Sequence, residues 1–432
     1  MSEVAIGCIG FSLLLIFMAM GLHVAVAMFG LALLGAISYL GVPATLELGT
    51  QFWGASNSFV LTAIPLYVLL GELLVRGGFT DRMYEAISYW VSFLPGGLLH
   101  TNIGASALFA AVSGSSVATA ATISTMALPS FKTRNFDPRL VFGTIAAGAT
   151  LGILIPPSIN LIVYGALTGV SVGKLYLAGF IPGFALAGLF MLVTIVWCLK
   201  NPSVVGPREV LPPLSVRVKA LHHLFVPLLI VAMVMGSIYL GWATPTESAA
   251  LGVVTVLVLC LCTRRLNLKM LNDSLLATIS TSAMIMFIMI AAFYLTFVLG
   301  VMGMPQALAD YVRDLGASAG ELILALTIFY LVLGCFLEAL PMIIGTIPIV
   351  YPMARTVGID PIWFGIYLII MCCIALITPP VGMVLYVVQG IRREGSISTV
   401  IVGVLPYLAI MIVFVALLYL FPGIATWLPN LE

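Results

Sequence analysis

The sequence predicts an all-α protein that crosses a membrane many times and contains two inverted repeats. Of its 432 residues, 62% are hydrophobic and only 8% are charged, whereas a soluble globular chain carries about 25% charged residues. Apolar runs long enough to span a bilayer as helices recur along the whole chain. Helix-breaking prolines recur at one fixed spacing in the two halves. Together these features predict a polytopic membrane protein built by duplication.

Composition also excludes several classes of function. The formal net charge of +1 argues against nucleic acid as a partner. The seven cysteines lie in or at the edges of apolar runs, and none has the spacing of a zinc or redox site. No phosphate-binding motif of the GxxxxGK[ST] type occurs, so ATP is not expected to be the direct energy source. The first apolar run follows "MSEVAIG", which lacks the basic start of a cleaved signal, and is predicted to be a retained helix.

The first half divides into scaffold helices and a first repeat. Residues 1–56 are predicted to form N-terminal transmembrane helices of the scaffold, and residues 57–200 form the repeat. Within it, 100–130 has a small and polar centre, "SGSS", between two half-length apolar arms, which predicts an inner re-entrant hairpin. The next helix, 138–170, is interrupted by two adjacent prolines in "LGILIPPSINLIVYG".

The second half has the same plan. Residues 201–273 form a basic, proline-rich linker and connecting scaffold helices, and residues 274–432 form the second repeat. Its outer hairpin is expected over 332–353 and its broken helix over 361–391, followed by a C-terminal helix. The hairpin carries Glu338, and a carboxylate at membrane depth costs about 2.5–3.5 kcal/mol on insertion scales. We therefore expect this carboxylate to be paired, hydrogen-bonded or near an ion.

A shift of 223 residues superposes the helix breakers of the two repeats. The matching positions are Pro129 with Pro352, Asp137-Pro138 with Asp360-Pro361, and Pro156-Pro157 with Pro379-Pro380. Overall identity between the halves is low. Because several breakers match in order at one offset, they indicate structural repeats rather than chance.

Basic residues predict that the repeats are inverted. They favour the cytoplasmic side of a membrane, and they gather at non-equivalent loops of the two copies. The first copy has Lys132, Arg134 and Arg139 before its broken helix and only Lys174 after it. The second copy has only Arg355 before its broken helix and Arg392 and Arg393 after it. This topology places both termini outside.

Inverted repeats with broken helices are typical of secondary transporters, with the binding site near the bilayer midplane. Proline has no N–H, so the carbonyls of residues 152 and 153 are expected to lose their helical partners. In hydrocarbon such carbonyls need another partner, and a sodium ion can satisfy several of them at once. The half-helix that begins after the break points its N–H groups at the same place and favours anions.

Four segments identify a family resemblance: "SGSSVATAAT", "GILIPPSINLIVYG", "WATPTESAALG" and "LITPPVGMVLYVV". They resemble the large membrane subunit of tripartite ATP-independent periplasmic (TRAP) transporters, and the resemblance covers essentially the whole chain. It implies an elevator-type importer in the bacterial inner membrane, with Na⁺ as coupling ion and no other cofactor. It also implies two protein partners, a small four-helix membrane subunit and a periplasmic solute receptor. Substrates would be small organic acids such as a C4-dicarboxylate or a sialic acid.

The resemblance implies three sets of site residues. The first sodium site would take oxygens from Ser113, Ser115, Gly152, Ile155 and Pro157. The second, placed by the 223-residue shift, is expected at Gly334, Ala375, Thr378 and Pro380. Ser113 and Ser115 map there onto Phe336 and Glu338, so more of its ligands should be carbonyls. Residues expected near the substrate cavity are Ser116, Asn160, Thr244 and Thr346.

Alternatives remain open from the residues alone. Thr244 precedes Pro-x-Glu, a pattern that also starts a helix without any binding role. A stand-alone sodium- or proton-coupled anion symporter would share the hairpins and repeats but need no receptor. An intramembrane enzyme would need a convergent acid–base pair, metal cluster or nucleophile, whereas Glu72, Glu247 and Glu338 are isolated in the sequence. A channel fits less well, because sodium-binding hairpins suit occlusion and alternating access.

Overall fold

The computed structural model describes residues 3–80, 82–132, 134, 136–202 and 211–431. Within them every regular element is helical, which confirms the predicted all-α class. Five helical segments of the described chain are long and apolar enough to cross a membrane: Val172–Lys200, Leu214–Tyr239, Pro245–Cys262, Leu268–Val301 and Ile397–Leu420. Part of the predicted basic linker, residues 203–210, lies outside the described residues.

The first half runs from the N-terminal scaffold into a helical hairpin and a broken helix. Its helices are α1 (Glu3–Ala19), α2 (Val24–Gly35), α3 (Glu47–Ser56), α4 (Ala63–Arg76), α5 (Met83–Val91), α6 (Leu98–Ser113), α7 (Ser116–Lys132), α8 (Pro138–Thr150), α9 (Ile159–Thr168) and α10 (Val172–Lys200). The hairpin is α6–α7, and the broken helix is α8–α9. Asp137 starts α8 by accepting a hydrogen bond from the Arg139 N–H, with Pro138 in the first turn.

The second half repeats this order after a short helix, α11. Its helices are α11 (Leu214–Ala220), α12 (His222–Tyr239), α13 (Pro245–Cys262), α14 (Leu268–Val301), α15 (Met304–Asp314), α16 (Ala319–Gly334), α17 (Ala339–Thr356), α18 (Pro361–Ala375), α19 (Met383–Arg392), α20 (Ile397–Leu420) and α21 (Gly423–Thr426). The second hairpin is α16–α17, and the second broken helix is α18–α19.

The 223-residue offset holds for helix boundaries as well as for prolines. Adding 223 to the first residues of α6–α10 gives 321, 339, 361, 382 and 395, and α16–α20 begin at 319, 339, 361, 383 and 397. The same addition takes the starts of α1, α2 and α3 to 226, 247 and 270, beside α12, α13 and α14 at 222, 245 and 268. The duplication therefore extends to the scaffold helices, beyond the repeat boundaries predicted from the prolines.

Contacts between the halves are reciprocal. Helix α7 of the first repeat packs against α19 of the second repeat. Reciprocally, α17, the equivalent of α7, packs against α9, the equivalent of α19. The guanidinium of Arg392, after the second break, lies 4.4 Å from the Phe142 ring centroid at the start of α8. In the reciprocal position, the Tyr164 hydroxyl near the end of α9 donates to the Pro361 carbonyl at the start of α18 at 2.6 Å. Equivalent segments of the two repeats thus make equivalent contacts, as an approximate two-fold axis between them produces.

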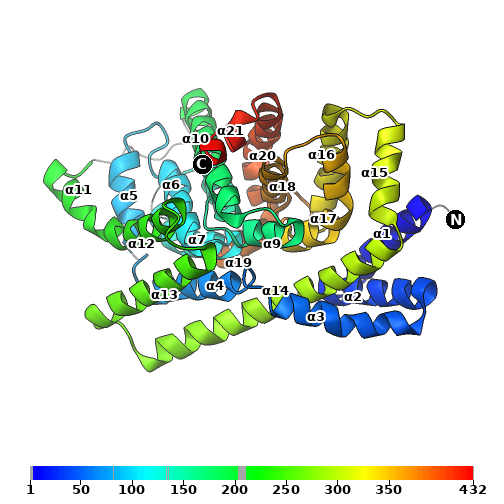
Figure 1. Cartoon of the computed structure of the whole chain (residues 1–432). Coiled ribbons are helices and arrows are strands. Elements are labelled where there is room, and N and C mark those ends of the chain that lie inside the picture. The colour runs from blue at the N-terminus through cyan, green and yellow to red at the C-terminus, as the bar shows by residue number, and fades with distance from the viewer. Residues whose placement is uncertain (1–2, 81, 133, 135, 203–210, 432) are drawn as a thin grey trace.

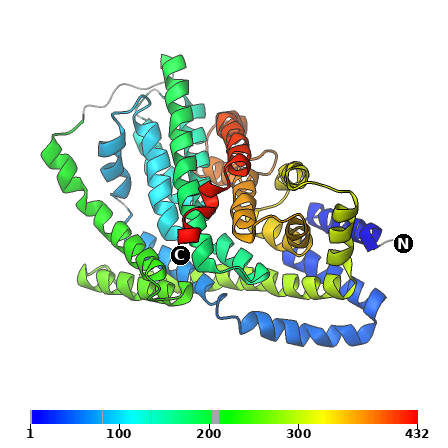
Figure 2. The ribbon, with the colours of Figure 1, turned by 45° about the horizontal axis from the view of Figure 1, so that its top comes forward.

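Figure 1 shows how the scaffold and the hairpins are arranged. The long α14 crosses the lower edge of the molecule, with α4 and α13 near one end and α2 and α3 near the other, and all but α13 pack against it. The hairpins and broken helices lie together along one side of α14, and Figure 2 shows the same arrangement after rotation.

Gly143 and Gly403 bring α8 and α20 into close contact, since a Cβ on Gly143 would lie 2.2 Å from the Gly403 carbonyl oxygen.

Candidate ion and substrate site

The tip of the first hairpin is a tight turn between two helices. Helix α6 ends at Ser113, Gly114 adopts the left-handed conformation with φ of 61°, and α7 begins at Ser116. Glycine takes this conformation without the steric cost of a Cβ. The turn leaves the backbone of Ser115 between the two arms of the hairpin, and its carbonyl accepts a hydrogen bond from the Thr119 N–H at 3.0 Å.

The break in the first broken helix frees one of the two predicted carbonyls. Helix α8 ends at Thr150, and a cis peptide bond joins Pro156 to Pro157. The Ile153 carbonyl accepts a hydrogen bond from the Ser158 hydroxyl at 2.5 Å, so a side chain stands in for the helical partner that this carbonyl is predicted to lose. No hydrogen bond to the Gly152 carbonyl is found within the described part of the chain, in agreement with the predicted loss of its helical partner.

The hairpin tip and the break contact each other through two glycines. A Cβ on Gly152 would lie 2.8 Å from the Ser115 carbonyl oxygen, and a Cβ on Gly114 would lie 2.8 Å from the Pro157 carbonyl oxygen. Each segment therefore presents a glycine to a backbone carbonyl of the other. The oxygens at this contact belong to backbone carbonyls and are neutral, and neutral oxygens suit a monovalent hard cation better than calcium, which usually takes carboxylates.

Hydroxyl groups order this tip, and one of them comes from Thr119, which is absent from the predicted set. The Thr119 hydroxyl donates to the Ser115 carbonyl at 2.7 Å and lies 3.2 Å from the Ser113 hydroxyl. Its spacing of four residues from Ser115 on a helix gives a signal in the sequence, because such residues share a helix face. Ser116 bridges to the broken helix, with its hydroxyl 3.4 Å from the Thr150 carbonyl.

The second predicted site is assembled less completely. Gly334 of α16 contacts α18, since a Cβ on it would lie 2.6 Å from the Ala375 Cβ. The Ala375 carbonyl accepts a hydrogen bond from the Thr378 N–H at 3.3 Å. The Thr378 hydroxyl donates to the Ile374 carbonyl at 2.7 Å. The Pro380 carbonyl accepts from the Tyr386 hydroxyl at 3.1 Å. The structure therefore brings Gly334, Ala375 and Thr378 together, while Pro380 is exposed and its carbonyl bonds to Tyr386.

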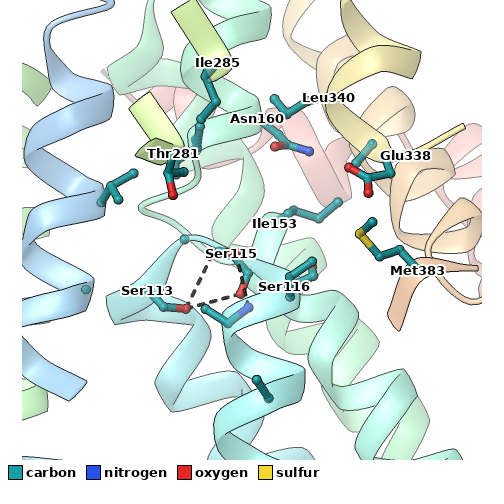
Figure 3. Close-up of a pocket in the computed structure, with 18 of the residues that line it drawn as sticks. Ser113, Ser115, Ser116, Ile153, Asn160, Thr281, Ile285, Glu338, Leu340 and Met383 are labelled. Carbon is teal, nitrogen blue, oxygen red and sulfur yellow. Dashed lines mark hydrogen bonds between the residues drawn. The ribbon is translucent and has the colours of Figure 1, made fainter. Parts of the chain in front are cut away.

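A cavity of about 480 Å³ lies between the two hairpin tips. Its lining includes Ser113, Ser115, Ser116 and Asn160 from the first repeat and Glu338 from the second. Figure 3 shows the three serines grouped on one hairpin and Glu338 facing the same space from the other. The cavity has the size that small-molecule sites use. No lysine, arginine or histidine occurs among the described residues that line it.

Two residues expected at the cavity lie elsewhere. Thr244 begins α13 through a capping box, in which its hydroxyl accepts from the Glu247 N–H at 3.3 Å and the Glu247 carboxylate accepts from the Thr244 N–H at 2.8 Å. Thr346 is buried in α17, 2.8 Å from the Tyr330 hydroxyl. Neither is among the residues that line the cavity. The helix-start interpretation of Thr244 therefore accounts for its contacts.

Comparison with known proteins agrees with this architecture. Residues 11–424 match the family model described as "Tripartite ATP-independent periplasmic transporter, DctM component". The chain belongs to this family. It is 33% identical to the sialic acid TRAP transporter large permease protein SiaM of Vibrio cholerae over 88% of each chain. It is 34% identical to the C4-dicarboxylate TRAP transporter large permease protein DctM of Pseudomonas aeruginosa over 89% of each chain.

Membership of the DctM family makes the chain a multi-pass transport protein rather than an enzyme. The DctM protein of Rhodobacter capsulatus is 32% identical over 98% of both chains, so the resemblance extends across the scaffold as well as the hairpins. A solved structure, the YdaH transporter of Alcanivorax borkumensis, shares the fold with a TM-score of 0.63 and 17% identity over 90% of each chain.

Proposed function

We propose that the chain is the large permease subunit of a sodium-coupled secondary importer for a small organic acid. The observation that carries this proposal is the contact between the first broken helix and the Ser113–Ser116 tip, which lines the cavity; at this contact each segment presents a backbone carbonyl to the other. Relatives named for sialic acid and for C4-dicarboxylates support an organic acid as substrate. By the same family relationship, a small membrane subunit and a periplasmic receptor would complete the transporter in the inner membrane.

The charge of the cavity supports coupling to a cation. An organic acid would enter a space whose described lining contains no basic side chain and includes the carboxylates of Glu72 and Glu338. The Glu72 carboxylate is paired with Arg76 at 2.8 Å. An anion in this space needs positive charge nearby. The N-terminus of α9 supplies only a partial positive charge through its helix dipole. Sodium bound at the hairpin tips would supply the remainder, so that the anion and cations travel together.

The arrangement of the helices supports an elevator mechanism. Both hairpins and both broken helices pack on one another and line one side of the cavity, while α4 and α14 line the other. Helix α14 and its neighbours would form the fixed scaffold, and the hairpin unit would carry ions and substrate across the membrane. Movement of this unit as one body exposes the same cavity to each side in turn, as alternating access requires.

Transport is expected to require a receptor. The permease and its small subunit, reconstituted in proteoliposomes with an inward sodium gradient, should move little free substrate. Addition of the receptor loaded with its own radiolabelled ligand should start uptake, and collapse of the sodium gradient should stop it. The measurement is the initial rate of ligand accumulation, with receptor from an unrelated system as control. Equal uptake of free ligand without receptor would instead favour a stand-alone symporter.

The repeats are expected to be inverted relative to the membrane. Arg139, in the first turn of α8, and Arg355, in the last turn of α17, are exposed residues beside the equivalent connections between hairpin and broken helix, while the side chain of Lys132 lies outside the described structure. Single cysteines replacing Arg139 and Arg355, in a background without native cysteines, should react with an impermeant maleimide from opposite sides of the membrane. Labelling of both from the same side would contradict this topology.

A further inference from the structure

Two equivalent residues of the repeats touch each other at the centre of the molecule. The Cys373 thiol donates to the Thr150 carbonyl at a distance of 3.2 Å, and the two residue numbers differ by 223, the repeat offset. Residues related by a two-fold axis can touch only close to that axis. Both side chains are completely buried, so this contact marks the place where the two broken helices meet.

The contact joins the two predicted sodium sites. On one side, the Thr150 carbonyl also accepts from the Ser116 hydroxyl at 3.4 Å, and Ser116 follows the Ser115 carbonyl of the first site. On the other side, Cys373 lies two residues before Ala375 of the second site. Its neighbour Cys372 places its sulfur 3.7 Å from the carbonyl of Ala339, the first residue of α17 at the tip of the second hairpin. A chain of direct contacts therefore runs from one hairpin tip to the other.

We infer that Cys373 is a positioning residue that couples the two sodium sites through the Thr150 carbonyl. This inference rests on the proposed sodium function. An ion in the first site fixes the Ser115–Ser116 tip, and the Ser116 hydroxyl then fixes the Thr150 carbonyl. That carbonyl holds Cys373 and the segment that leads to Ala375. The ligands of the second ion are therefore already ordered, and the second ion binds more tightly, which is positive cooperativity. By linkage, an ion in the second site strengthens binding at the first site by the same factor.

The test is equilibrium binding of radioactive sodium to the purified protein in lipid nanodiscs. The wild-type protein should bind two ions with a Hill coefficient above about 1.5. Cys373→Ala should still bind two ions, but with a Hill coefficient of about 1 and half-saturation at about fivefold higher sodium or more. Cys373→Val, which fills most of the thiol volume without a donor, should behave in the same way. Cys373→Ser should restore cooperativity, because its hydroxyl can donate to the Thr150 carbonyl.

Cys198→Ala, which removes another buried thiol, is the matched control and should keep the wild-type binding curve. An unchanged Hill coefficient in the Ala or Val variant would overturn the inference, as would a wild-type Hill coefficient of about 1 with two ions bound. Failure of the Ser variant to restore cooperativity would also overturn it. A wild-type protein that binds no sodium would instead overturn the proposed sodium function.

Discussion

Replacing Gly152 with alanine is expected to abolish sodium-dependent transport. The new methyl group would lie 2.8 Å from the Ser115 carbonyl oxygen and 2.9 Å from the Ser116 Cα. Both atoms belong to the backbone, so the hairpin tip must move away from the break. Overpacking of this kind costs about 1–3 kcal/mol. Here it would displace the backbone groups that are expected to bind the ion. If the whole cost falls on ion binding, sodium affinity should drop by about five- to 150-fold.

Sodium binding and uptake should be measured on the same preparations of Gly152→Ala and wild type. Gly188→Ala on α10 is the matched control, because a Cβ at Gly188 meets nothing within 4 Å. The control should bind sodium and transport as the wild type does. Wild-type sodium affinity in a folded Gly152→Ala protein would show that the ion does not bind between the tip and the break.

Local sequence signals predict the breaks, the hairpin tips and their order. Adjacent prolines stop a helix wherever they occur, and Ser-Gly-Ser-Ser cannot continue an apolar transmembrane helix. These local rules place Ser115 and Gly152 in separate segments that both have irregular backbone. Their mutual contact follows from the packing of α7 against α8, and only the family resemblance indicates it in advance.

Contacts that depend on packing or on weak local competition are harder to predict. The scaffold repeat of α1–α3 in α12–α14 carries no matching prolines, so its register is visible only in the helix boundaries. The Ser158 hydroxyl donates a hydrogen bond to the Ile153 carbonyl. The absence of an N–H on proline does not predict this side-chain donor. At the second break, the Tyr386 hydroxyl donates a hydrogen bond to the Pro380 carbonyl. Repeat equivalence predicts where the second site lies but not which of its oxygens are free.

Replacing Ser115 with alanine is expected to weaken sodium dependence by about ten- to hundredfold. The substitution removes a hydroxyl beside the site, and that hydroxyl also accepts from the Ala118 N–H at 3.4 Å in the first turn of α7. The Ser115 carbonyl remains, still held by the Thr119 hydroxyl at 2.7 Å. The loss is therefore that of one interaction with a charge, about 1.5–3 kcal/mol, and the fold should survive.

Uptake rate against sodium concentration measures this effect, with expression and receptor binding matched between variants. Ser124→Ala is the control, because Ser124 is a buried serine of the same helix whose hydroxyl has no hydrogen-bond partner among the described residues. The control should reproduce the wild-type curve, while Ser115→Ala should reach half-maximal uptake only at much higher sodium. Coincident curves for Ser115→Ala and wild type would place the coupling ion away from the Ser115 hydroxyl. Because Gly152→Ala displaces the tip backbone and Ser115→Ala does not, the two variants together separate the contribution of the carbonyl ligands from that of the hydroxyl.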